Sequence, residues 1–202
     1  MAAVVKVFRY LHKTKDYHLT FGPRNRDHVL QNITTHTAIN GESSVNNNPG
    51  VISFFDASYG GEKPSAGEIE FFMGERAAGP ISWVSYRLPI TPLSSCEAEW
   101  IAATRATTSV KATRDILEFI GHPQNEPTFL FCDNKSAVML SDGNMSSKRM
   151  KHVATRIAFL REHVEAGNIT LFHISTVGQI ADIFTKPLPA STFHNIRGFM
   201  LQ

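Results

Sequence analysis

Three strand-like segments followed by one long helical repeat constrain the fold of this chain more than any other feature of its sequence. From residue 51, the run VISFFDAS is almost wholly apolar, the segment GEIEFFMG alternates, and a third short segment surrounds ISWVS. Such runs, bounded by Gly and Pro, are typical of β-strands and favour an antiparallel meander. Apolar and small residues then recur at helical spacing from Glu99 to Ile120, until Gly121-His122-Pro123 ends the repeat.

The remainder of the chain alternates between strand-like and helical segments. TFLFC (128–132) and ITLFHI (169–174) read as strands, whereas helical patterns begin at Asn134, cover 153–164 and return as a last turn within 179–187. Three strands, a helix and then this alternation predict an α/β fold, with helices packed against a mixed sheet.

The first 49 residues differ in character from the rest. Val4, Val7, Phe8 and Leu11 fall on one stripe of a short amphipathic helix, and the stretch from Gly22 to Gly50 is polar and ends in NGESSVNNNPG. Such a composition is typical of a linker or mobile loop. The expected organisation is therefore an appended segment at 1–49, a main domain at 50–190 and a C-terminal tail at 191–202.

Composition excludes some classes of function and permits others. The chain has 20 Lys and Arg against 18 Asp and Glu, so its formal net charge of +2 permits nucleic-acid binding without demonstrating it. No apolar stretch approaches the ~20 residues that a membrane span needs, and no secretory leader is visible at the start. The expectation is a soluble, intracellular protein that contacts no membrane.

Two aspartates close two of the apolar strands. Asp56 follows VISFF and Asp133 follows TFLFC, so the two would lie side by side if their strands are neighbours. A carboxylate left unpaired at such a buried position costs several kcal/mol. A bound metal ion is one remedy.

Two further carboxylates lie where helices begin. Glu99 shares the buried stripe of the long helix, whereas Glu97 is turned about 200° away from it and is explained by the first turn, with Ser94 or Ser95 as the cap. Asp182 opens the last helical turn, where an acidic residue is ordinary. Together with the two aspartates, these hard oxygen donors would suit Mg²⁺, and a pair of such ions is one solution to phosphodiester cleavage.

Six segments, in order, are similar to the ribonuclease H domain that closes the polyprotein of copia-type LTR retrotransposons. They are FFDASYGGEKPSAG, GPISWVSYR, PLSSCEAEWIAATRA, FCDNKSAVML, KRMKHVATRIAFLREHVEAGNI and HISTVGQIADIFTKPLP. VFRYLHKTKDYHLTFG moreover resembles the end of the tether that joins reverse transcriptase to ribonuclease H in these polyproteins.

The resemblance implies an α/β ribonuclease H-like fold: a five-stranded mixed sheet, three strands antiparallel and two parallel, with helices on both faces. It implies that Asp56, Glu99, Asp133 and Asp182 are the catalytic residues and the ligands of two Mg²⁺ ions, with Mn²⁺ as an alternative. The implied activity is endonucleolytic hydrolysis of the RNA strand of an RNA–DNA hybrid, leaving 5′-phosphates, during reverse transcription. The expected partners are the hybrid and a reverse transcriptase domain, in a cytoplasmic virus-like particle or in the nucleus.

Two auxiliary features have alternative readings. His173 is a candidate for the loop histidine of many cellular ribonucleases H, although its place in a strand favours a structural role. Cationic residues near the 153–164 helix could bind phosphate or form a solvated helical face; they are Lys148, Arg149, Lys151, His152 and Arg156.

Two other classes of function stay open. The chain could be a catalytically inactive, retrotransposon-derived module that binds nucleic acid or acts structurally, since it carries little of any polymerase. A nuclease of the same fold directed at DNA is the third hypothesis, and the ADIFTKPL block argues against it.

Overall fold

A five-stranded mixed sheet forms the centre of the protein. The computed structural model describes residues 2–37, 50–60, 63–141 and 153–201. The strands are β1 (Gly50–Ser58), β2 (Ser65–Met73), β3 (Ala78–Arg87), β4 (Thr128–Cys132) and β5 (Ile169–His173), in the order β3-β2-β1-β4-β5. β2 pairs antiparallel with β1 and β3, and β4 pairs parallel with β1 and β5. The predicted ribonuclease H-like fold class is confirmed.

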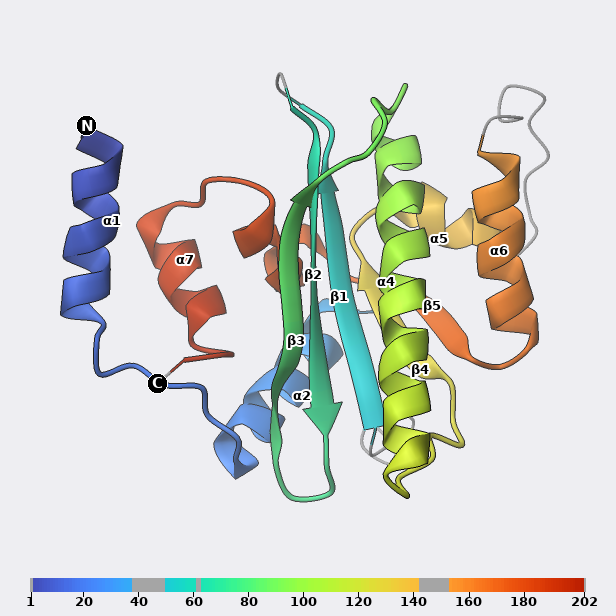
Figure 1. The fold of residues 1–202 in the computed structure, drawn as a ribbon, viewed down its shortest axis with the longest axis horizontal. Coiled ribbons are helices and arrows are strands. Elements are labelled where there is room, and N and C mark those ends of the chain that lie inside the picture. The colour runs from blue at the N-terminus through green and yellow to red at the C-terminus, as the bar shows by residue number, and fades with distance from the viewer. Residues whose placement is uncertain (1, 38–49, 61–62, 142–152, 202) are drawn as a thin grey trace.

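Helices cover both faces of this sheet (Figure 1). On one face lie α4 (Ser95–Phe119), α5 (Lys135–Ser141) and α6 (Ala154–Glu165), and on the other lie α2 (Pro23–His36), α7 (Ala190–Arg197) and the short 3₁₀ helices η2 (Thr176–Gly178) and η3 (Ile180–Phe184). α1 (Ala2–Lys13) stands at the outside, beyond α7 (Figure 1). No helix in the described ranges combines the length and apolarity that a membrane crossing demands.

The apolar run of β1 follows from its place between two cores. Successive side chains of a strand point to opposite faces, so Phe54 packs into the core beneath α2, α7 and η3, whereas Phe55 packs into the core beneath α4 and α6. Both rings are fully buried. A strand buried on both faces consists mainly of apolar residues, and in β1 Ser53 is the polar exception before Asp56.

The expected linker and tail were partly wrong. Residues 23–36 form α2 rather than a loop, because Val29, Leu30 and Ile33 recur on one face of the segment and are buried against the sheet. Beyond residue 190, α7 and the residues after it bury Ile196 and Phe199 in the same core. The domain limits at residues 50 and 190 stay predictions. Segments on both sides of each limit nevertheless pack on the same core. Residues 38–49, the other part of the expected linker, lie outside the described ranges.

Candidate active site

The register of two parallel strands places Asp56 beside Asp133. Phe54 of β1 is the partner of Phe131 of β4. Asp56 lies two residues beyond Phe54 in β1, and Asp133 lies two residues beyond Phe131, directly after the end of β4. Because the strands run in the same direction, the two carboxylates reach the same edge of the sheet together. The condition set for the two aspartates, that their strands are neighbours, is met.

The start of α4 positions Glu99 over this edge. Ser94 caps the helix by accepting a hydrogen bond from the amide of Glu97 at 3.1 Å, and Oε2 of Glu97 accepts one from the amide of Leu93 at 2.6 Å. The helix that begins in this way aims Glu99 inward, where its Oε1 accepts a hydrogen bond from the amide of Ala57 at 3.2 Å. Glu97 and Glu99 thus make different contacts, although both are buried, with 4% of each exposed.

Asp56, Glu99 and Asp133 converge into one cluster. Each offers an oxygen atom, and these atoms all lie within 4.8 Å of one another. Burial, followed by the charges of Asp56 and Asp133, raises the pKa of Glu99 well above its ordinary value, and burial also raises the pKa of Asp56. Crowded, desolvated carboxylates of this kind are stabilised by a cation, and oxygen donors suit Mg²⁺ or Mn²⁺. The side chains therefore fit a divalent metal ion.

Asp182 lies next to this cluster rather than within it. It sits in η3, is 4% exposed, and its Oδ1 forms an ion pair of 2.8 Å with Nζ of Lys186. Burial raises the pKa of Asp182 to about 6, although the hydrogen bond from Lys186 opposes this shift. Asp182 adjoins the cluster through Asp56, which interacts with both Asp182 and Lys186.

Three polar residues around the carboxylates escaped the sequence analysis. Thr185 donates to Oδ2 of Asp56 at 2.5 Å, Thr176 donates to Oδ2 of Asp133 at 2.9 Å, and Lys186 lies 3.8 Å from Oδ2 of Asp56. The spacing of Lys186, four residues after Asp182, was a usable signal because residues four apart on a helical segment are neighbours. No comparable signal pointed to the threonines.

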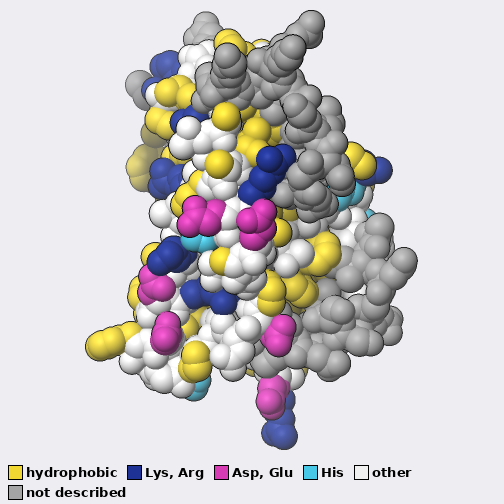
Figure 2. Space-filling view, turned by 90° about the vertical axis from the view of Figure 1, so that its right-hand side faces the viewer, with side chains coloured by type: hydrophobic (Ala, Val, Ile, Leu, Met, Phe, Trp, Pro, Cys, Tyr) yellow, Lys and Arg dark blue, Asp and Glu magenta, His cyan; other side chains and the backbone are white. Residues whose placement is uncertain are grey.

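The auxiliary residues are placed only in part. His173 is the last residue of β5 and pairs with Cys132 in the register of the sheet, as its strand pattern predicted. Lys148, Arg149, Lys151 and His152 lie outside the described ranges, and Arg156 is half-buried on α6. On the face seen in Figure 2, the described cationic and anionic side chains are interspersed, so that no block of one sign is visible there.

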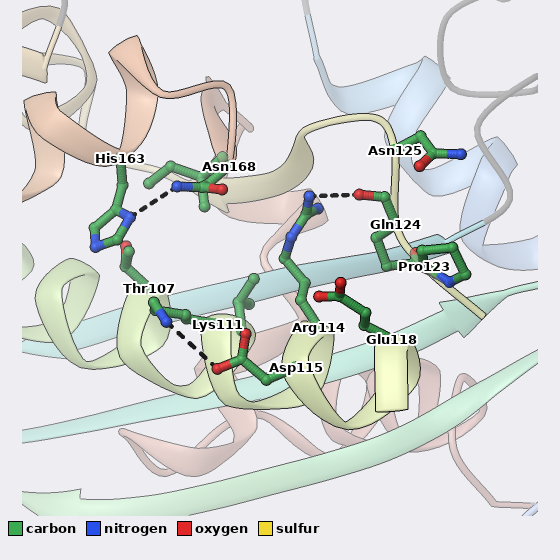
Figure 3. Close-up of a pocket in the computed structure, with 12 residues that line it drawn as sticks. Thr107, Lys111, Arg114, Asp115, Glu118, Pro123, Gln124, Asn125, His163 and Asn168 are labelled. Atoms are coloured by element: carbon green, nitrogen blue, oxygen red, sulfur yellow. Dashed lines mark hydrogen bonds and ion pairs between the residues drawn. The ribbon is translucent and has the colours of Figure 1, made fainter. Parts of the chain in front are cut away.

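A cavity of about 260 Å³ lies elsewhere, at the C-terminal half of α4. Figure 3 shows Lys111 and Arg114 beside Asp115 and Glu118 in its wall, with His163 and Asn168 opposite. Gln124, another wall residue, accepts a hydrogen bond from the amide of Val51. Val51 lies near the start of β1, and Asp56 lies near the other end of the strand, roughly 17 Å away. The cavity is therefore separate from the carboxylate cluster.

Comparison with known proteins finds Pol polyproteins of transposons among the relatives. A retrovirus-related Pol polyprotein from transposon RE1 of Arabidopsis thaliana is 30% identical over 143 residues, 71% of this chain and 10% of the relative. The Pol polyprotein from transposon RE2 of the same plant is 26% identical over 197 residues, 96% of this chain and 13% of the relative. The chain thus spans about a tenth of the length of these curated relatives.

The chain was also compared with solved structures and with protein-family models. A solved structure of RNase H1 from Halobacterium salinarum NRC-1 matches with a TM-score of 0.49 at 15% identity, over 67% of this chain and 93% of that one. No protein-family model matches the chain.

Proposed function

The chain belongs with the retrovirus-related Pol polyproteins of transposons, as a segment with the ribonuclease H fold, and on that premise we propose that it hydrolyses the RNA strand of RNA–DNA hybrids. The observation that carries the proposal is the convergence of Asp56, Glu99 and Asp133, from three separate elements, within 4.8 Å at one edge of the sheet. In that role the domain would act beside a reverse transcriptase domain, inside the cell.

The proposed task of the carboxylates is to hold two divalent metal ions. Asp56, Glu99 and Asp133 would supply carboxylate ligands to the metal ions. Asp182, in η3, would complete the set of ligands. Two bound Mg²⁺ ions would supply Lewis acidity, which favours attack of water on a phosphodiester and offsets charge on the departing 3′ oxygen. Mn²⁺ would serve in the same site.

The chain's own residues would hold this arrangement in place. The amide of Ala57 and the thiol of Cys132 each donate to Glu99, at 3.2 and 3.5 Å. Thr185 donates to one oxygen of Asp56 and Thr176 to one oxygen of Asp133, and these bonds hold the two carboxylates in place. Ligands held in this way need little reorganisation when an ion binds, which favours affinity.

A cleavage assay tests the proposal directly. The full chain is incubated with an RNA–DNA hybrid labelled on the RNA strand, in Mg²⁺ or Mn²⁺, and we expect RNA fragments that carry 5′-phosphates. Asp133→Asn should abolish cleavage, because an amide is a poorer ligand and carries no charge. Asp115→Asn, on the exposed part of α4, is the matched control and should cleave as the unaltered protein does.

Other substrates and outcomes separate the alternatives. Hybrid binding in EDTA as tight as in Mg²⁺, with no turnover, would support an inactive binding module instead. Preferential cleavage of duplex DNA would identify a DNA-directed nuclease of the same fold. Undiminished cleavage by Asp133→Asn would exclude the site proposed here.

A further inference from the structure

One cation is already built into the carboxylate site. Nζ of Lys186 lies 2.8 Å from Oδ1 of Asp182 and 3.8 Å from Oδ2 of Asp56. The side chains of the two aspartates are 6% and 5% exposed, whereas that of Lys186 is 37% exposed. The ammonium group therefore enters a buried pair of carboxylates from the solvent side.

The backbone that carries Lys186 is tied to the sheet. Ser85 of β3 donates to the carbonyl of Phe184 at 2.6 Å, and Ser65 of β2 donates to the carbonyl of Thr185 at 3.2 Å. Gly67 of β2 lets this segment approach closely, since a Cβ there would lie 2.4 Å from Cβ of Phe184. With the backbone held in this way, Lys186 can leave the aspartates only by turning its partly exposed side chain outward.

Asp56 takes part in two groups of charged side chains. Its Oδ2 is occupied by Thr185 and faces Lys186, whereas Asp56, Glu99 and Asp133 together offer three oxygens to one metal position. The ammonium group of Lys186 and a metal ion are both positive and compete for the same carboxylates. A metal ion that uses Asp182 together with Asp56 must therefore displace the ammonium group or share the carboxylates with it.

We propose that Lys186 is a positioning residue that acts as an internal counter-cation and sets how divalent ions enter the site. It stabilises Asp56 and Asp182 in the metal-free protein, so that the first ion binds at Asp56, Glu99 and Asp133, and the ion on the Asp182 side binds only as Lys186 withdraws. The inference rests on the proposed function only in assigning the ions to these carboxylates; it does not require that the protein cleaves a hybrid.

Metal binding without any substrate tests this role. Mn²⁺ is titrated into the metal-free full chain, free Mn²⁺ is followed by electron paramagnetic resonance, and thermal unfolding is recorded in EDTA. In Lys186→Gln we expect the weaker of the two Mn²⁺ sites to tighten at least roughly tenfold, because a unit charge about 4 Å from the ligands is removed. In EDTA the same variant should unfold roughly 3–6 °C lower, since two buried carboxylates lose their cation.

Two further variants show whether charge is responsible. Lys186→Arg keeps the positive charge and should restore the unfolding temperature in EDTA without tightening Mn²⁺. Lys111→Gln removes a lysine from an exposed pair with Asp115, also four residues apart, and should change neither measurement.

The outcomes separate this inference from the proposed activity. A simple structural defect would weaken Mn²⁺ binding, so unchanged or weaker binding by folded Lys186→Gln overturns the role of Lys186. Mn²⁺ binding that tightens as much in Lys186→Arg as in Lys186→Gln would also overturn the role of Lys186. If Lys186→Gln tightens Mn²⁺ while the unaltered protein cleaves no hybrid, the counter-cation role holds and the ribonuclease proposal fails.

Discussion

The thiol of Cys132 donates a hydrogen bond to Oε2 of Glu99 across 3.5 Å in the interior between α4 and β4. Cys132 is fully buried, and burial followed by the charge of Glu99 raises its pKa well above the ordinary value. The second cysteine, Cys96, is only half-buried, and burial raises its pKa to about 11. Since the thiolate is the reactive form, both thiols should react slowly and Cys132 far more slowly.

Alkylation of the native protein checks this order. Iodoacetamide at pH 8, followed by mass spectrometry of peptides, should modify Cys96 first and Cys132 only after unfolding in urea. Equal rates for the two thiols in the native protein would show that Cys132 is not shielded as described.

Gly67→Ala should damage both stability and cleavage. The added Cβ would meet Phe184 at 2.4 Å, so η3 must shift, and Thr185 with it, away from Asp56. We expect the free energy of unfolding to fall by about 1–3 kcal/mol, as overpacking commonly costs, with a lower cleavage rate at temperatures where the variant is folded. Gly60→Ala has no atom within 4 Å of the added Cβ and is the control. The two measurements are urea unfolding and the hybrid assay, and equal effects of both substitutions would refute the close-approach argument.

Glu68 should make the folded state less stable as pH rises. Burial, followed by the charge of Glu70, raises the pKa of Glu68 from 4.5 to about 7. An acid whose pKa is higher in the folded than in the unfolded state binds its proton better when folded, so its favourable contribution is complete below pH 4.5 and is lost as pH rises through 7. The loss of folding free energy is on the order of 3 kcal/mol.

Glu68→Gln should remove this loss, because the amide carries no proton to release. Relative to the unaltered protein, the variant should gain stability between pH 5 and pH 8 in urea unfolding with EDTA present. Glu118→Gln, at an exposed position on α4, should show no such gain. A difference between Glu68→Gln and the unaltered protein that stays constant with pH would contradict the raised pKa.

Truncation should locate the true start of the folding unit. Removing residues 1–18 deletes α1, whose apolar side chains Val4, Phe8 and Leu11 are more than half exposed, so little stability should be lost. Removing residues 1–49 also deletes α2 with its three buried apolar side chains, Val29, Leu30 and Ile33, each worth roughly 1.5–3 kcal/mol. The summed contribution of these three side chains approaches the whole free energy of unfolding of an ordinary domain. Circular dichroism should show cooperative unfolding for the first truncation and none for the second. A cooperative transition in both would support a domain that begins at residue 50.

The strands and three of the carboxylates were predictable because their signals are local. An apolar run closed by an aspartate is visible in VISFFD and TFLFCD, and the helical stripe of Glu99 needs only the spacing of its neighbours. The sheet order came from the family resemblance. The helix α2 was missed because only Val29, Leu30 and Ile33 are buried apolar residues in a segment otherwise polar, and a polar helix resembles a linker until the core that it covers is known.

Other features depend on contacts that no local pattern reports. Glu68 and Glu70 alternate with apolar residues as if they faced solvent, yet α4 covers them, and Glu70 accepts a hydrogen bond from Thr113 at 2.6 Å. The approach of Lys186 to Asp56 likewise joins residues from the two ends of the main domain. Such pairs are set by how η3 and α4 dock on the sheet, which the sequence of either element alone does not determine.

The parallel pairing of β1 with β4 has a kinetic consequence. Asp56 and Asp133 are brought together although β2, β3 and α4 all lie between them in the chain. Contacts between residues so distant in sequence form slowly, because closing the intervening loop costs entropy before any contact repays it. A divalent ion would therefore find its ligands assembled only in the finished domain. Its concentration would govern how long the domain stays folded, and not how fast it forms.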